Sequence, residues 1–361
     1  MRLLFLCNTL YQIIAASCIR EMYPNDEAEL ILSDHSTGNK KIFESFKKTG
    51  LVFNEVYYIE TKYLYKYDDS ISRDERNKEY KSLDTINNMV KLNDNYDMFF
   101  CANAEPFSTR VVNYLKNKNS KVQINWFEDG LSAYNFDKKY FPSWKGYIKS
   151  WMKGLLGLYG VTSSVENYYV FQPDKMEWKP RASVKRISSM SGKLSKELGV
   201  IFDYENCIDK YEEKYIFFED GAMDWDTNAD IEIVNVIADI VGKENIMIKI
   251  HPRNPVNRFK ELGFKTNQDT SIPWEIIATN IDIKNKILMT MYSQSIITPE
   301  VLMGVKGKAI SFGLLNPEND KSLNQLFDYI CRQYLNKDTS RYYVPKTKVE
   351  LIEIVKKLNA E

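Results

Sequence analysis

The sequence begins MRLLFLCNTLYQIIAAS (residues 1–17). The apolar run Leu3–Cys7 predicts a buried strand, and the run that follows Thr9 predicts a helix. A secretory signal peptide is the competing interpretation, but Asn8, Thr9 and Gln12 interrupt the apolar run and no clean cleavage site follows. The opening therefore predicts the first strand, loop and helix of an α/β domain.

Short apolar runs and amphipathic stretches alternate along most of the chain. The runs that predict buried strands are Leu3–Cys7, Glu29–Ser33, Val52–Ile59, Asp97–Cys101, Val122–Phe127, Tyr168–Phe171, Tyr215–Phe218, Ile246–Ile250, Ile287–Met291 and Ala309–Phe312. The stretches that predict helices are Leu10–Met22, Lys40–Lys48, Leu83–Leu92, Pro106–Lys118, Ala229–Val241, Pro273–Thr279, Ser295–Met303, Lys321–Leu335 and Lys348–Leu358. This alternation predicts α/β architecture with parallel sheets covered by helices on both faces.

The chain has 361 residues, which is more than one hydrophobic core usually serves. We predict an N-terminal domain at 1–200 that carries an insertion at 137–200, and a C-terminal domain at 213–340. Both are expected to be Rossmann-like and doubly wound, and to face a central cleft. Residues 341–361 are expected to form a helix that packs back across the domains.

Composition excludes several classes of protein. Lys and Arg together number 49, as do Asp and Glu, so the net charge at pH 7 is zero and no nucleic-acid partner is indicated. The five cysteines include no Cys-x-x-Cys pair, so neither a zinc site nor a disulfide framework is expected. No run of about 18 apolar residues exists, so no membrane-spanning helix is expected.

Two acidic residues and a glycine, Glu128-Asp129-Gly130, follow the predicted strand Val122–Phe127. The carboxyl ends of parallel strands are where α/β folds bind ligands, and a carboxylate in a closed cleft can take a proton from a hydroxyl. A plain Asp-Gly turn explains the same letters. A second triplet at 219–221 opens the C-terminal domain, where we expect contacts to a ligand base rather than catalysis.

His251 is one of only two histidines, and it follows the predicted strand Ile246–Ile250. Such a histidine can donate to a phosphate or protonate a leaving oxygen, and Lys249 and Arg253 add positive charge. Pro252 ends the strand and directs the loop. A histidine satisfied by the backbone is the competing interpretation.

Two further motifs follow in the C-terminal domain. Glu275 lies just inside a predicted helix after Pro273, where an acid is ordinary helix-start chemistry but can also receive ribose hydroxyls. Ser293 and Ser295 precede the predicted helix Ser295–Met303, and hydroxyls beside a helix N-terminus can bind an anion.

These motifs together resemble bacterial sialyltransferases of the lipooligosaccharide, capsule and polysialic acid types. Four motifs in the family's order carry the resemblance: the acid-acid-glycine triplet at 128–130, the His-Pro pair at 251–252, the Pro-x-Glu of 273–275 and the serines at 293 and 295. The opening Cys7-Asn8-Thr9-x-Tyr11-Gln12 also looks like the family's first strand and loop. The resemblance implies a GT-B fold and catalysis without a metal ion.

The resemblance also implies roles for particular residues. Glu128, with Asp129 beside it, is expected to be the general base, and His251 is expected to meet the CMP phosphate and act as general acid. Glu275 is expected to bind the ribose, and the two serines the phosphate. The donor-binding residues implied are Asn8, Thr9, Gln12, Pro252, Arg253, Glu275, Ser293 and Ser295.

We therefore expect an inverting, cytoplasmic glycosyltransferase that moves sialic acid from CMP-sialic acid to a surface glycan, with no metal and no other cofactor. A transferase that uses CMP-Kdo or CDP-glycerol, and a non-catalytic module of capsule assembly, are the alternatives. The acceptor, the linkage and the oligomeric state stay open, a homodimer included. Asp220 also stays open as the base in place of Glu128.

The stretch 140–159 (YFPSWKGYIKSWMKGLLGLY) is aromatic and basic. As a helix from Trp144 it would carry an apolar stripe beside Lys145, Lys149 and Lys153, an arrangement that suits an anionic membrane surface. That location would suit a lipid-linked acceptor at the inner face of the plasma membrane. A helix packed on the domain, or a dimer contact, is the competing interpretation.

Overall fold

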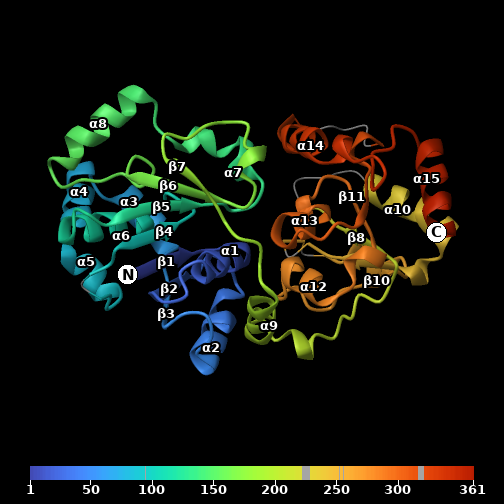
Figure 1. The fold of residues 1–361 in the computed structure, drawn as a ribbon, viewed down its shortest axis with the longest axis horizontal. Coiled ribbons are helices and arrows are strands. Elements are labelled where there is room, and N and C mark those ends of the chain that lie inside the picture. The colour runs from blue at the N-terminus through green and yellow to red at the C-terminus, as the bar shows by residue number, and fades with distance from the viewer. Residues whose placement is uncertain (94, 222–227, 252, 255, 316–320) are drawn as a thin grey trace. The chain divides into compact units, whose positions relative to one another are not determined.

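A computed structural model describes residues 1–361 except 94, 222–227, 252, 255 and 316–320, and except the side chains of 321–324. The described residues form two compact units, Met1–Phe202 and Asp203–Glu361. Each unit is built on one parallel sheet, coloured blue to green in the first and yellow to red in the second (Figure 1).

The sheet of the first unit has seven strands in the order β3-β2-β1-β4-β5-β6-β7, all parallel. The strands are β1 (Arg2–Cys7), β2 (Glu27–Ser33), β3 (Glu55–Ile59), β4 (Met98–Cys101), β5 (Gln123–Phe127), β6 (Val165–Val170) and β7 (Ser183–Arg186). Residues 3–7 of β1 are buried because a central parallel strand is covered on both faces.

Nine α-helices are described in this unit. They are α1 (Leu10–Glu21), α2 (Asn39–Thr49), α3 (Tyr63–Ser70), α4 (Arg73–Lys81), α5 (Leu83–Met89), α6 (Pro106–Lys118), α7 (Ser132–Asn135), α8 (Trp144–Gly154) and α9 (Gly192–Ile201). Thr9 caps α1 by accepting from the backbone N–H of Gln12, so the chain turns into the helix directly after β1.

The second unit repeats this winding, with six parallel strands in the order β10-β9-β8-β11-β12-β13. The strands are β8 (Tyr215–Phe218), β9 (Ile246–Lys249), β10 (Lys265–Thr266), β11 (Ile287–Thr290), β12 (Lys308–Ser311) and β13 (Tyr342–Tyr343). In both units the order runs outward from the first strand and then reverses, which is the doubly wound Rossmann pattern.

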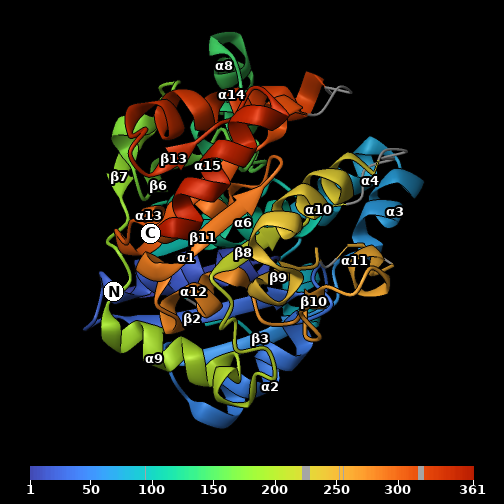
Figure 2. The ribbon, with the colours of Figure 1, turned by 90° about the vertical axis from the view of Figure 1, so that its right-hand side faces the viewer.

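The α-helices described in the second unit include one at the end of the chain. They are α10 (Ala229–Val241), α11 (Arg258–Glu261), α12 (Trp274–Asn280), α13 (Thr298–Met303), α14 (Lys321–Gln333) and α15 (Lys348–Ala360). Leu351, Val355 and Leu358 of α15 join the buried core that also contains Ile233 and Ile237 of α10, and Figure 2 shows the two helices side by side. The packing of this last helix across the domains stays a prediction.

The predicted fold class is confirmed, because two parallel doubly wound sheets are present. The strands that the sequence missed are β7, β10 and β13, which are short and lie at or next to sheet edges, where no continuous apolar run is needed. The predicted helix Ser295–Met303 is wrong at its start: a 3₁₀ turn occupies Gln294–Ile296, and α13 begins at Thr298. Among the described residues no helix is long and apolar enough to cross a membrane.

Candidate active site

In a doubly wound sheet, ligands bind beyond the carboxyl ends of the strands, near the point where the strand order reverses. In the first unit this point lies between β1 and β4. The loops that follow β1, β4 and β5 bring together the predicted residues Thr9 and Gln12, the unpredicted Asn103, and Asp129. The sequence separation of these contacts reaches 120 residues, so only the fold assembles this group.

Glu128 is completely buried at the end of β5. Its Oε1 accepts from the hydroxyl of Tyr11 at 2.6 Å, and its Oε2 accepts from the hydroxyl of Tyr134 at 2.5 Å and the backbone N–H of Phe171 at 2.8 Å. Burial raises the pKa of Glu128 to about 7, since the three hydrogen bonds only partly offset the loss of water. Both carboxylate oxygens are therefore engaged by the protein.

Asp129 is only partly exposed, and it lines a cavity of about 370 Å³. Its Oδ1 accepts from the hydroxyl of Thr9 at 3.2 Å, and its Oδ2 accepts from the side-chain amide of Gln12 at 2.8 Å. Burial raises the pKa of Asp129 above the ordinary aspartate value, because no cation compensates the loss of water. The other side chains that line the cavity include Asn103, Glu105, Ser132, Asp137 and Tyr140.

The predicted donor-binding residues Asn8, Thr9 and Gln12 form hydrogen bonds with other protein groups and do not line this cavity. Gln12 joins Asp129 to Asn103 and also accepts from the backbone N–H of Asn8. Asn8 is buried and accepts from the hydroxyl of Ser33 at 2.6 Å. In this arrangement Gln12 orients the Asp129 carboxylate, while donor binding by these residues stays a prediction.

Sequence reasoning missed the two tyrosines on Glu128 and a second polar pair nearby. Tyr11 belonged to the quoted opening motif, but nothing in the sequence assigns Tyr134 to Glu128. His35 follows β2, and its Nε2 lies 3.4 Å from Oε2 of Glu105, which lines the same cavity as Asp129. The scarcity of histidine was the only sequence signal for this residue.

The second unit has its own triplet, Glu219-Asp220-Gly221, directly after β8. Glu219 is buried and accepts from the guanidinium of Arg258 at 3.0 Å. Asp220 accepts from the backbone N–H of Tyr292 at 3.3 Å, and burial raises its pKa to about 7. Asp220 therefore lies between the loops that follow β8 and β11.

His251 lies against this triplet. A side chain on Gly221 would place its Cβ 2.8 Å from Cε1 of His251, so only glycine lets the imidazole approach so closely. The Nδ1 of His251 accepts from the backbone N–H of Arg253 at 3.1 Å, which leaves the ring proton of the neutral imidazole on Nε2. Burial and the charges of Arg253 and Lys249 lower the pKa of His251 to about 4. Pro252 lies outside the described residues.

Lys249 and Glu275 are oppositely charged groups that influence each other's ionisation in the second unit. Both are removed from water: burial lowers the pKa of Lys249 and raises that of Glu275, and each charge partly offsets the other's shift. We expected Lys249 only to add positive charge near His251. In the structure its charge acts on Glu275, the residue predicted to bind the ribose.

Ser293 and Ser295 are joined by a hydrogen bond of 3.0 Å between their hydroxyls. The Ser293 hydroxyl also accepts from the backbone N–H of Ser295, and Trp274 of α12 donates to the Ser295 carbonyl at 2.9 Å. The serine loop is thereby tied to the helix that carries Glu275. Because α13 is short and starts only at Thr298, any anion here would meet hydroxyls and loop N–H groups rather than the end of a long helix.

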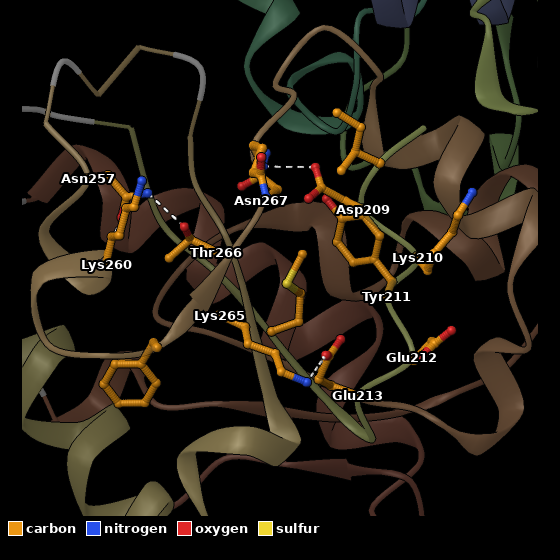
Figure 3. Close-up of a pocket in the computed structure, with 14 residues that line it drawn as sticks. Asp209, Lys210, Tyr211, Glu212, Glu213, Asn257, Lys260, Lys265, Thr266 and Asn267 are labelled. Atoms are coloured by element: carbon orange, nitrogen blue, oxygen red, sulfur yellow. Dashed lines mark hydrogen bonds and ion pairs between the residues drawn. The ribbon is translucent and has the colours of Figure 1, made fainter. Parts of the chain in front are cut away.

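A larger cavity, of about 740 Å³, lies along the edge strand β10 (Figure 3). None of the predicted site residues lines it. Some of its polar side chains pair with one another: Lys265 pairs with Glu213 at 2.7 Å, and Asn257 donates to Thr266 at 2.8 Å. The predicted catalytic and donor-binding residues therefore lie at the carboxyl ends of the strands and not in this groove.

Among the residues that the structure describes, no group of three or more His, Cys, Asp or Glu side chains is arranged to hold a metal ion. Activity without a metal stays a prediction.

Comparison with known proteins identifies the family. The family model "Alpha-2,8-polysialyltransferase (POLYST)" matches residues 3–310. The chain belongs to the alpha-2,8-polysialyltransferase family. A search of curated proteins finds no match. The predicted resemblance to bacterial sialyltransferases is confirmed by this match.

Several solved structures with a similar fold are glycosyltransferases of the GT-B type. The glycosyltransferase of kitacinnamycin aligns with 100% of this polysialyltransferase-family chain and 91% of its own, at 11% identity and a TM-score of 0.53. UGT89C1 of Arabidopsis thaliana, solved with UDP, aligns with 99% and 90%, at 8% identity and a TM-score of 0.54. The glycosyltransferase VinC, solved with DTDP, aligns with 100% and 92%, at 10% identity and a TM-score of 0.52. Family and fold together are those of a glycosyltransferase.

Proposed function

We propose that the chain is an inverting sialyltransferase that uses CMP-sialic acid, needs no metal ion, and adds sialic acid to a surface glycan on the cytoplasmic side of the membrane. The single observation that carries the proposal is the environment of Asp129, a carboxylate at a cavity with a raised pKa, held by Thr9 and Gln12 and by no cation. A base of this kind is what removal of a proton from a sugar hydroxyl requires. The family description supports sialic acid as the group transferred.

The geometry moves our proposal for the base from Glu128 to Asp129. Glu128 is fully buried and both its oxygens are occupied by donors of the protein, whereas Asp129 reaches the cavity. In the proposed reaction the acceptor hydroxyl gives its proton to Asp129 as its oxygen attacks the anomeric carbon. The bond from that carbon to the CMP phosphate breaks on the opposite side, and CMP leaves with the bonding electrons.

The second unit would receive the nucleotide. The Nε2–H of neutral His251, the ammonium of Lys249 and the hydroxyls of Ser293 and Ser295 are donors suited to a phosphate that gains charge as CMP leaves. Glu275 would accept from the ribose hydroxyls. The low pKa of His251 favours hydrogen bonding to phosphate over proton donation.

The family name includes an α-2,8 linkage, which supports the 8-hydroxyl of a terminal sialic acid as the acceptor group. The test measures CMP, CDP or glycan products from the purified full chain, given CMP-sialic acid, CMP-Kdo or CDP-glycerol with an oligosialic acid or a galactoside acceptor. We expect turnover of CMP-sialic acid with oligosialic acid, and NMR of the first product should show an inverted anomeric centre. Turnover of CMP-Kdo or CDP-glycerol alone would overturn the donor, and no turnover with any pair would indicate a non-catalytic module.

A further inference from the structure

The helix α8 and its flanks expose large apolar side chains to an unusual degree. Trp144 is 69% exposed, Trp151 67% and Leu155 70%, and no residue of α8 is buried. The helix lies at the rim of the first unit in both views (Figures 1 and 2). A helix that packs on the domain through its apolar stripe, one part of the competing interpretation, is therefore wrong for these exposed side chains, while a dimer contact stays untested. An exposed apolar surface of this kind usually marks a binding surface.

The exposed side chains follow a helical pattern. At about 100° per residue, Trp144, Ile148, Trp151 and Leu155 fall within an arc of about 60°. The lysines at 145, 149 and 153 form an adjacent row, and all three are exposed. We call the apolar arc and this row the α8 surface. Tyr147 borders the apolar arc on the side away from the lysines and is half-buried, and it lines a cavity of about 610 Å³ with Trp151, Leu155 and residues of the unit's body.

Positive charge predominates around the α8 surface, because the nearby Glu166 is paired with Lys116. Residues 138–165 contain no Asp or Glu, while Lys138 and Lys139 add to the three lysines of the helix. Arg181 lies over the rings of Tyr147 and Trp144, at 5.0 and 5.8 Å from their centroids. Within the described part of the chain, no carboxylate forms an ion pair with any of these five lysines. A concentration of unpaired positive charge beside apolar side chains calls for an anionic partner.

We propose that the α8 surface binds the anionic face of a lipid bilayer, with the helix lying in the plane of the interface. Tryptophan and leucine would enter the boundary between headgroups and acyl chains, while the lysine ammonium groups stay at the phosphates. A second copy of the chain fits less well, because a two-fold contact through this helix would place lysines against lysines with no acid in the segment to pair them. The inference rests on this surface alone and not on the chemistry proposed above.

The experiment measures co-sedimentation of the full chain with phosphatidylcholine vesicles that contain or lack phosphatidylglycerol. The wild type should bind only the anionic vesicles, and K145E/K149E/K153E should weaken binding by more than about tenfold, since each lysine near an anionic surface is worth about 1 kcal/mol. W144S/W151S should weaken it as well. The matched control K40E/K41E/K48E changes the net charge equally on exposed positions of α2, at the other end of the unit in Figures 1 and 2, and should bind as wild type.

Thermal melting checks that each variant is folded, and turnover of a short soluble acceptor should be unchanged in all of them. Equal binding to both kinds of vesicle, no binding to either, or an equal loss in the α2 control would overturn the proposal. A dimer by analytical ultracentrifugation that W144S/W151S dissociates, without vesicle binding, would assign the surface to a second copy instead.

Discussion

The tripeptide Glu-Asp-Gly occurs twice, at 128–130 and at 219–221, and each copy follows a strand of a doubly wound sheet. The first follows β5, the fifth strand of its unit, and the second follows β8, the first strand of its unit. The topological counterpart of the second triplet is therefore the loop after β1, with Asn8 and Thr9. The two copies are not internal repeats of one site.

Their surroundings differ in charge. In the first unit Glu128 meets hydroxyls and a backbone N–H, and Asp129 meets a hydroxyl and an amide, so all donors are neutral. In the second unit Glu219 is paired with the guanidinium of Arg258. The glycines differ too, because Gly130 has a φ of +77°, while Gly221 makes room for an imidazole. The same three letters thus stand in two different electrostatic surroundings, and the first agrees with the proton acceptor that we propose.

The largest expected effect is on Asp129. The isosteric change Asp129→Asn removes the base but keeps an acceptor, and should lower kcat by about 10²–10⁴-fold with CMP affinity unchanged. The matched control is Asp220→Asn, at the aspartate of the second triplet, whose pKa burial also raises, and this change should leave most of kcat intact. Steady-state kinetics and CMP titration calorimetry measure both. Loss of kcat in the control with activity retained in Asp129→Asn would exchange the roles of the two triplets.

The pH dependence of stability, compared between the wild type and Glu128→Gln, should distinguish the buried Glu128 from a surface carboxylate. Because its pKa is raised from 4.5 to about 7, its contribution to stability is complete below 4.5 and is lost as the pH rises through 7. Glu128→Gln cannot ionise, and its amide oxygen can keep the bonds from Tyr134 and Phe171 while its NH2 donates to the Tyr11 hydroxyl, so the wild type should lose about 3 kcal/mol relative to it over this range. Urea unfolding at several pH values measures the difference. Parallel pH profiles would show that Glu128 is not held in the way the structure indicates.

A smaller effect is expected at the serine loop. Ser293→Ala with Ser295→Ala removes two hydroxyl donors from the proposed phosphate site and should weaken CMP binding by about tenfold to a hundredfold, the range of about 1.5–3 kcal/mol for a hydrogen bond to a charged group. Ser340→Ala, at a serine that bonds only within its own turn, is the control. Unchanged CMP affinity in the double variant would remove the serines from the phosphate site.

The smallest expected effect is that of metal removal. Initial rates in EDTA should equal those in its absence, because His251, Lys249 and the serine hydroxyls would hold the phosphate in place of a divalent ion. Rescue of an EDTA-treated sample by Mg²⁺ or Mn²⁺ would contradict this and would favour a donor of another class.

The sequence by itself determined the α/β class, the presence of two doubly wound domains and the family, because these follow from local sequence patterns and short motifs. Helices Pro106–Lys118 and Ala229–Val241 and strand Tyr215–Phe218 have the bounds that their apolar periodicity predicted. The acid triplets and the His-Pro pair were visible because strand ends could be located. The edge strands β7, β10 and β13, of two to four residues, could not be predicted, because an edge strand needs no continuous apolar run.

Only the tertiary structure decided what each functional side chain meets. Tyr11 of α1, 117 residues away in sequence, and Tyr134 of α7 both donate to Glu128, and no sequence pattern encodes that convergence. Burial then sets the pKa of the acids, and burial depends on the whole fold. Periodicity likewise identified the apolar stripe of α8 but not its surroundings, because a stripe that faces a core and a stripe that faces solvent have the same spacing.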